Sequence, residues 1–289
     1  MTEIKERLLK TLKAFISFCE ENQLTYYGAC GTVLGAVRHH GFIPWDDDID
    51  VYMPRADYER LKTLQNQIPN PYKLADIPEL GYTAPFMKFM DMNSSIWEFE
   101  RIPYMIGVYV DIFPLDDCPD DPKAMIETKK QLDNAFFQYF RSLEEWTMLD
   151  LLKMLVHRDR PALSYRYDTK FHYVPKRKAF HKEVLRLLDE LSHFKGEHYY
   201  FNTTDVYAEC LVFKKEWFEN PVDMPFEDIT IKIPGSYDEY LKYLYEDYMK
   251  LPPVEERNSH HARTYMNLDR WVSIDEAKSV IKVSKKIIN

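Results

Sequence analysis

The chain has 289 residues, 45% of them hydrophobic, which is enough for one large domain or two small ones around a substantial core. Its formal net charge is −9 at pH 7, and such an acidic surface repels a phosphate backbone, so we exclude nucleic acid as a partner. Local charge can oppose the net charge, so the composition still permits a phosphate-bearing ligand.

Cysteine usage and hydropathy both favour an intracellular setting. Cys19, Cys30, Cys118 and Cys210 lack CxxC spacing and are typical of free thiols in a reducing compartment. The N-terminal stretch is amphipathic, unlike a signal peptide, and no segment approaches the roughly 18 apolar residues of a membrane span. We therefore predict a cytoplasmic protein. A location at the inner face of the membrane is compatible with the same sequence features.

The first predicted elements are a helix, a short strand and a second helix. Apolar residues recur at helical spacing over residues 3–22, and residues 25–30 are typical of a strand ending at Gly31. Thr32 is suited to cap the next helix, which stops near Gly41. A glycine at a strand-to-helix junction lets backbone N–H groups approach a phosphate, so Gly31 and Thr32 are candidate phosphate-binding residues.

An alternating strand is predicted next, over residues 47–53. Asp48, Asp50 and Tyr52 share its polar face, while the apolar face points into the core. Carboxylates this close repel one another unless a cation compensates them, and Mg²⁺ or Mn²⁺ prefers such oxygen ligands. Acidic runs are usually solvated turns, but the apolar neighbours here favour a metal site.

A helix over residues 57–64 and strands over 84–90 and 107–113 follow. Pro114 is expected to end the last strand, which leaves Asp116 and Asp117 in the turn after it.

Two charged residues interrupt these apolar strands. Asp111 would complete a triangle of carboxylates if its strand pairs beside that of Asp48 and Asp50, or it is an exposed edge residue. Such a triangle can hold one or two divalent ions, and Asp111 could also accept a proton from an acceptor hydroxyl. Lys88 is either a ligand for a donor phosphate or a surface lysine.

The second half of the chain is mainly helical at first and then strand-rich. The predicted elements are a helix over 122–155, an irregular basic and aromatic stretch over 156–178, a helix over 179–194, strands within 199–233, and helices over 237–248 and 274–287. The pattern predicts an α+β fold, a mixed sheet flanked by helices. We divide it into a catalytic core (1–119), a helical insertion (120–198) and a C-terminal segment that completes the core (199–289).

A glycine turn, then Asp-x-Asp on the next strand, then a third acid resembles the nucleotidyltransferase superfamily and, more closely, the LicD family. The matching segments are 31–39, 41–50, 110–116 and 248–253, with Arg257 and His260 or His261 after the last. The resemblance extends over about 25–116 and 224–261, and it is poor in between.

The resemblance implies a nucleotidyltransferase-like core and a known chemistry. LicD-like proteins are taken to transfer phosphocholine from CDP-choline to sugars of teichoic acids or surface glycans, and fukutin and its relatives move ribitol phosphate from CDP-ribitol. Asp48 and Asp50 match the metal-binding pair, and Asp111 matches the third carboxylate. Gly31 and Thr32 match the phosphate-binding turn, where the superfamily more often has Gly-Ser.

Three further cationic residues are candidates for donor binding. Arg38 suits either a phosphate or a salt bridge to the acidic run, while Arg257 and His261 could close over donor or acceptor. Adjacent histidines on a helix point apart, so a zinc site is disfavoured. Aromatic residues of the helical insertion fit a choline-binding cage or simple core packing, and its basic residues fit an anionic glycan, a membrane surface or a solvated face.

We therefore predict a metal-dependent transferase that moves phosphocholine or a similar phosphoalcohol from a CDP-linked donor. The expected acceptor is a hydroxyl of a surface glycan or teichoic acid precursor. The sequence is compatible with an acceptor linked to a lipid and with peripheral contact between the protein and the membrane. Nucleotidyl transfer to a small acceptor is an alternative, because the same metal cluster permits it. A catalytically silent binding protein is a third reading, against which the retention of Asp48, Asp50 and Asp111 argues.

Overall fold

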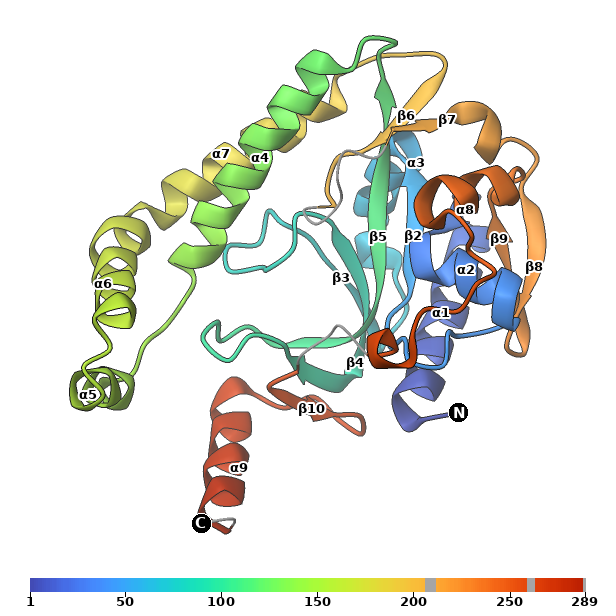
Figure 1. The fold of residues 1–289 in the computed structure, drawn as a ribbon. Helices are drawn as coiled ribbons and strands as arrows, with labels where there is room; N and C mark the ends of the chain where they lie inside the picture. Colours follow the sequence, from blue (N-terminus) through green and yellow to red (C-terminus); the bar gives the residue numbers. More distant parts are fainter. Residues whose placement is uncertain (206–211, 259–262, 288–289) are drawn as a thin grey trace.

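The computed structural model describes residues 1–205, 212–258 and 263–287. A mixed, eight-stranded sheet forms its centre, with helices on both sides (Figure 1), which confirms the predicted α+β class. The strands are β1 (Tyr27–Gly28), β2 (Asp50–Pro54), β3 (Tyr72–Ala75), β4 (Met87–Trp97), β5 (Ile106–Cys118), β6 (Tyr199–Asn202), β7 (Val212–Lys214) and β10 (Tyr265–Asn267), with β8 (Val222–Phe226) and β9 (Ile229–Ile233) in a separate hairpin. The helices are α1 (Glu3–Glu21), α2 (Cys30–His39), α3 (Arg55–Thr63), α4 (Lys123–Ser142), α5 (Met148–Val156), α6 (Arg160–Asp168), α7 (Arg177–Ser192), α8 (Tyr237–Tyr245) and α9 (Ile274–Ile287).

The order of the strands brings the predicted functional segments together. The central path is β1-β2-β5-β4-β10, with β3 beside β4 and β6 beside β5. The β2 and β5 strands run parallel, whereas β4 and β5 are antiparallel. In this register Asp111 is the partner of Asp50 on one side and of Lys88 on the other. Three neighbouring strands thus carry three charged residues in one row across the sheet.

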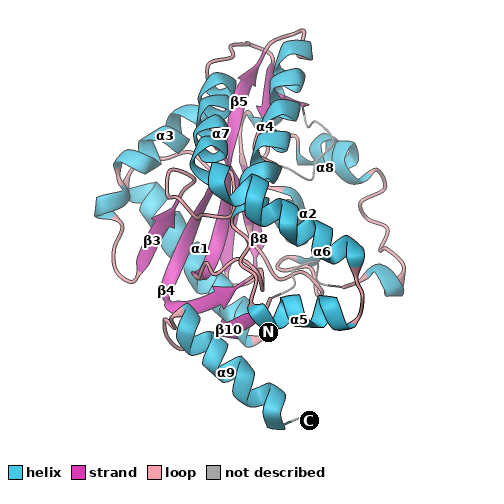
Figure 2. Cartoon of the chain, turned by 90° about the vertical axis from the view of Figure 1, so that its left-hand side faces the viewer, coloured by secondary structure: helices cyan, strands magenta, loops and turns pink. Residues whose placement is uncertain are grey.

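Helices cover both faces of the sheet. The α4 and α7 helices pack on each other and lie over one face, as Figures 1 and 2 both show, while α1, α2 and α8 lie on the other side. The apolar stripe predicted for the first helix is buried, with Leu12 and Phe15 fully inaccessible. The expected polar face of β2 is only partly exposed: Asp50 is half-buried, and Tyr52 is buried against Phe113 and Tyr240.

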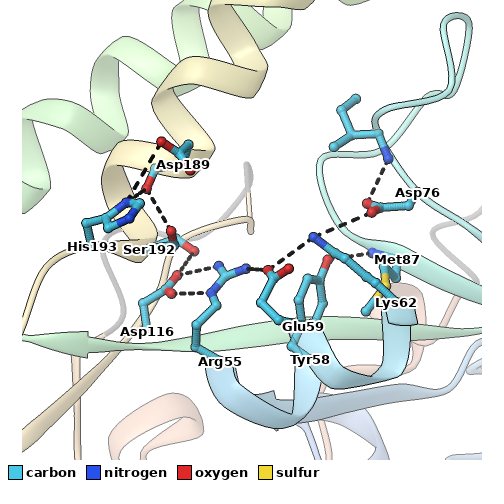
Figure 3. A network of polar contacts seen from close by, with 12 residues as sticks. Arg55, Tyr58, Glu59, Lys62, Asp76, Met87, Asp116, Asp189, Ser192 and His193 are labelled. Carbon is cyan, nitrogen blue, oxygen red and sulfur yellow. Dashed lines mark hydrogen bonds and ion pairs between the residues drawn. The ribbon is translucent and has the colours of Figure 1, made fainter. Parts of the chain in front are cut away.

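The β5 strand corrects the expectation that Pro114 ends it. The strand runs through Pro114 to Cys118, so Asp116 lies within the sheet and not in a turn. Its carboxylate is almost fully buried and accepts two hydrogen bonds from Arg55, at 2.6 and 2.8 Å, and one from the hydroxyl of Thr203. Figure 3 shows Arg55 between Asp116 and Glu59 in a chain of polar contacts. A buried carboxylate is tolerated here because these donors compensate it.

Two helix boundaries also differ from the sequence expectation. Residues 122–155 form two helices instead of one, because α4 ends at Ser142 and a capping box of Thr147 and Asp150 starts α5. The second helix begins at Cys30, before the expected cap Thr32, so the strand ahead of it keeps only two residues. The proposed division of the chain at 119 and 198 stays a prediction.

Along the described part of the chain, no helix combines the length and the apolar character needed to cross a bilayer. Cys19, Cys30 and Cys118 are free thiols, and Cys210 lies outside the described residues.

Candidate active site

A cavity of about 610 Å³ lies between the sheet and α4. Its floor comes from the row of charged residues on the sheet, and its wall comes from α4 and from the loops before β4 and after it. The residues that line it are Cys30, Asp48, Asp50, Thr83, Ala84, Pro85, Phe86, Lys88, Glu98, Phe99, Tyr109, Asp111, Phe113, Asp133, Phe136, Phe137, Phe140 and Asp205.

The floor brings together the three predicted carboxylates. Asp50 and Asp111 are partners on the parallel strands β2 and β5, and the N–H of Asp111 donates to the carbonyl of Ile49 at 2.9 Å. Asp48 lies in the loop just before β2 and reaches the same cavity. Asp205, which follows β6, adds a fourth carboxylate.

The floor has an excess of negative charge. Burial raises the pKa of Asp50 well above its usual range, and the neighbouring carboxylates of Asp48 and Asp111 raise it further. Burial and the charge of Asp48 likewise raise the pKa of Asp46 to about 8. Among the described lining residues there are six carboxylates and a single cationic side chain, Lys88. The cavity is therefore suited to positively charged groups.

Lys88 is held by the sheet and not exposed on it. Its ammonium donates to Asp111 at 2.6 Å and lies 3.4 Å from the centre of the Tyr109 ring. The side chains of both Lys88 and Asp111 are less than 10% exposed. A buried ion pair at this distance fixes both groups in place.

The glycine turn supports the acidic segment from behind. Thr32 is buried, and its hydroxyl accepts the N–H of Asp50 at 2.9 Å, so it positions the β2 backbone. Gly31 lies beside the acidic run, and a Cβ at this position would approach the Asp46 carboxylate to 2.8 Å. Neither residue lines the cavity, whereas Cys30 at the start of α2 does.

Two other predicted donor-binding residues, Arg38 and Arg257, lie outside the lining of the cavity. Arg38 donates to the carbonyl of Tyr248 at 2.7 Å, and burial lowers its pKa. Arg257 lies over the Trp45 ring at 5.3 Å and donates to the Pro252 carbonyl. His261 falls outside the described residues.

A further arginine, absent from the sequence predictions, fixes the acidic segment. Arg263 forms an ion pair with Asp47 and donates to its backbone carbonyl at 3.0 Å. The two side chains are each only 13% exposed, so this contact ties the C-terminal part of the chain to the loop before β2. A lone arginine far along the chain gives no signal for such a pairing.

Phenylalanines form the wall opposite the carboxylates. Phe136, Phe137 and Phe140 come from α4, and the ring of Phe140 meets that of Phe99 at 4.9 Å and 90°. Phe137 remains 59% exposed. Two acids, Glu98 and Asp133, also line the cavity: Glu98 accepts from the Tyr109 hydroxyl and Asp133 from Lys129. Sequence reasoning missed both acids, because single acids on a loop and on an amphipathic helix look like surface residues.

The floor has the chemistry of a site for a hard divalent cation. Within the ranges that the structure describes, no three carboxylate, imidazole or thiol side chains already stand close enough to hold an ion, and Lys88 engages Asp111 instead. The donors are nevertheless all carboxylate oxygens, the ligands that a hard divalent cation prefers, and burial together with the charges of Asp48 and Asp111 raises the pKa of Asp50. These residues therefore fit Mg²⁺ or Mn²⁺.

The three strands that form the floor of the cavity belong to a part of the chain that matches a known protein family. Residues 23–138 match the family described as "LicD/FKTN/FKRP, nucleotidyltransferase domain", a span that includes β2, β4, β5 and most of α4. These residues thus form a LicD-family domain, which confirms the resemblance seen in the sequence.

Comparison with individual proteins extends the similarity beyond this domain. Over 265 residues the chain is 28% identical to the "Lipopolysaccharide cholinephosphotransferase LicD" of Haemophilus influenzae. The aligned region covers 88% of this chain and 92% of that protein. Shorter matches are 33% identity over 79 residues to an uncharacterized protein of Rickettsia prowazekii and 40% over 50 residues to one of Rickettsia typhi. These cover 27% and 17% of this chain, and 26% and 16% of those proteins.

Proposed function

We propose that the protein transfers phosphocholine from CDP-choline to a hydroxyl group of lipopolysaccharide or a related surface glycan, such as a teichoic acid precursor. One observation carries this proposal: a single cavity joins a carboxylate floor to a phenylalanine wall. The similarity to a lipopolysaccharide cholinephosphotransferase, over 88% of this chain, supports the same assignment. We place the reaction on the cytoplasmic side of the membrane, where nucleotide-linked donors are found.

The phenylalanine wall suits the trimethylammonium group of choline. Quaternary ammonium groups are recognised by aromatic rings set at angles to one another, because the ring faces attract the positive charge without hydrogen bonds. Phe99 and Phe140 meet at 90°, and Phe137 offers a largely uncovered ring beside them. Glu98 adds negative charge to this end of the cavity, whereas the charge of Asp133 is paired with Lys129. A neutral polyol such as ribitol or glycerol would gain nothing from these features.

The carboxylate floor suits the diphosphate of the donor only with a cation present. Four carboxylates would otherwise repel the donor's own negative charges. Mg²⁺ or Mn²⁺, held by Asp48, Asp50 and Asp111, would neutralise the diphosphate and stabilise charge on the transferred phosphoryl group. Gly31, Thr32, Arg38, Arg257 and His261 remain candidates for support of the donor, the first two by shaping the backbone around Asp50.

The side chains on the floor account for the transfer. The acceptor hydroxyl oxygen bonds to the phosphorus that carries choline, the bond from that phosphorus to the CMP oxygen breaks, and CMP leaves with the electron pair. The hydroxyl proton passes to the carboxylate of Asp111. Lys88, already beside Asp111, supplies positive charge next to the donor phosphate. Positioning and charge stabilisation provide most of the rate enhancement.

A donor panel tests the assignment. With Mg²⁺ present, we expect CDP-choline to raise the unfolding temperature more than CDP-ribitol or CDP-glycerol does, and to yield choline-labelled glycan together with free CMP. The same ligand should give neither product nor stabilisation in EDTA. A higher ranking of CDP-ribitol would overturn the choline assignment, and transfer of labelled CMP to the acceptor would favour nucleotidyl transfer instead.

A further inference from the structure

The α5 helix presents an apolar surface away from the body of the protein. None of its nine residues is buried. Met148, Leu149, Leu152, Leu155 and Val156 are between 53% and 77% exposed. Leu149, Leu152 and Val156 are spaced by three and four residues and therefore lie on one helix face. Figure 1 shows α5 at the end of the arm formed by α4 and α6, remote from the central sheet.

This apolar face is a built feature and not a frayed end. A capping box fixes the start of α5, since the Thr147 hydroxyl accepts from the N–H of Asp150 while the Asp150 carboxylate accepts from the N–H of Thr147. The other face of α5 is half-buried at Leu151 and Met154. The helix is thus held by its cap and by one side, and exposes leucine side chains on the other, where polar residues are the rule.

The charge of the surrounding segment is opposite to that of the whole chain. Residues 148–178 contain eight basic and three acidic side chains, although the chain carries −9. The three acids are engaged within the segment or at its base: Asp150 caps α5, Asp159 caps α6, and Asp168 pairs with Arg141. The exposed basic side chains are Lys153, Arg158, Arg160, Lys170, Lys176 and Lys178.

We propose that α5 is a membrane-docking helix that places its leucine face among the headgroups of an anionic phospholipid bilayer. Apolar side chains flanked by lysine and arginine are the combination that binds such an interface, through burial and through attraction to negative lipids. A second copy of the chain is a poorer occupant, because two basic segments would repel each other. Docking of this arm would bring the cavity to acceptors carried on lipids, but the evidence for it is independent of the proposed function.

Vesicle flotation of the full chain tests this surface. We expect the protein to float with phosphatidylcholine vesicles that contain about one third phosphatidylglycerol, and about tenfold less with phosphatidylcholine alone or at high salt. Leu152→Glu should lower binding to the anionic vesicles at least about tenfold. Leu80→Glu is the matched control, because Leu80 is 46% exposed against 54% for Leu152 but lies in the loop before β4.

Three outcomes would overturn the proposal. The first is wild-type protein that stays unbound with anionic vesicles, which would leave a protein partner as the occupant. The second is an equal loss of binding in Leu80→Glu. The third is a wild-type dimer in light scattering that Leu152→Glu converts to monomer, which would make α5 an interface between copies. Transfer to a water-soluble acceptor should be unchanged in Leu152→Glu, so a failure of docking is distinct from a failure of the proposed chemistry.

Discussion

The floor and the wall of the cavity are built in different ways. Asp50, Asp111 and Lys88 lie on adjacent strands, and the register of the sheet fixes their spacing. Phe137 and Phe140 come from a helix that covers the sheet, and Phe99 comes from a loop. Strand pairing holds the floor rigid, whereas the wall depends on how α4 packs. In the proposed function, the floor would supply the chemistry and the wall would select what is transferred.

Removing the charge of Asp50 is the strongest test of the difference between the floor and the wall of the cavity. Asp50→Asn keeps the shape of the side chain but removes a charge that burial and Asp48 disfavour. We expect turnover to fall roughly 10³-fold for every CDP-linked donor, because the floor loses a metal ligand. Since the amide relieves repulsion, the unfolding temperature should stay equal or rise. Transfer assays and thermal melts measure both, with the exposed Asp228→Asn as control.

Activity within tenfold of wild type in Asp50→Asn would contradict the floor model. A lowered unfolding temperature would show that the charge is compensated within the protein.

The Arg55–Asp116 pair tests the stability of the sheet next to the floor. Although burial opposes its charged form, the Asp116 carboxylate raises the pKa of Arg55. Arg55→Met leaves Asp116 as a buried, poorly compensated charge, so we expect a loss of about 3 kcal/mol in the free energy of unfolding. Urea denaturation measures it. Arg186→Met, at a pair on the surface of α7, should leave the midpoint unchanged, and equal effects at the two sites would refute the distinction.

This pair also marks the limit of what the sequence predicts. The Asp-x-Asp spacing led us to expect Asp48 and Asp50 on one side of the chain, and both line the cavity although β2 begins only at Asp50. Asp116 was expected in a turn, since Pro114 usually ends a strand; a long strand with partners on both sides overrode that preference. Its partner Arg55 is 61 residues away, and no local pattern encodes such a contact.

The wall was harder to predict than the floor for the same reason. Phe136, Phe137 and Phe140 fit the helical pattern of a packed face, and nothing local separates a cavity wall from a core. Asp205 and Glu98 reach the cavity only through the tertiary fold. The Thr32 hydroxyl, which supports the backbone of Asp50, was expected to face a phosphate. Strand register thus made the floor predictable, while helix packing decided the wall.

The ion pair of Lys88 and Asp111 tests whether a positive charge on the floor is needed for turnover. Lys88→Met leaves Asp111 buried without its ammonium and removes a positive charge from the donor phosphate, so we expect roughly 100-fold lower turnover. Lys13→Met is the matched control, because Lys13 also pairs at 2.6 Å but with the exposed Asp228. Steady-state transfer assays compare the two. If both variants lost activity equally, the position of Lys88 in the cavity would have no special role.

The phenylalanine wall should control which donor binds and leave the chemistry intact. We expect Phe137→Ala to raise the KM for CDP-choline roughly tenfold, because an exposed cation–π contact and some apolar contact are lost. The KM for CDP-glycerol should not change, since it carries no ammonium group. Competition between the two donors measures the ratio directly. Phe171→Ala is the matched control, because Phe171 is 55% exposed, close to the 59% of Phe137, but does not line the cavity.

The ratio of the two donors separates selection from catalysis. A fall in kcat with both donors would place Phe137 in the general architecture of the cavity, and the wall would then not differ in role from the floor. Loss confined to CDP-choline requires that the ring of Phe137 contacts the choline end of the donor, because the nucleotide and the diphosphate are the same in both donors. That result would fix the direction of the donor, with its diphosphate over Asp50 and its alcohol against α4.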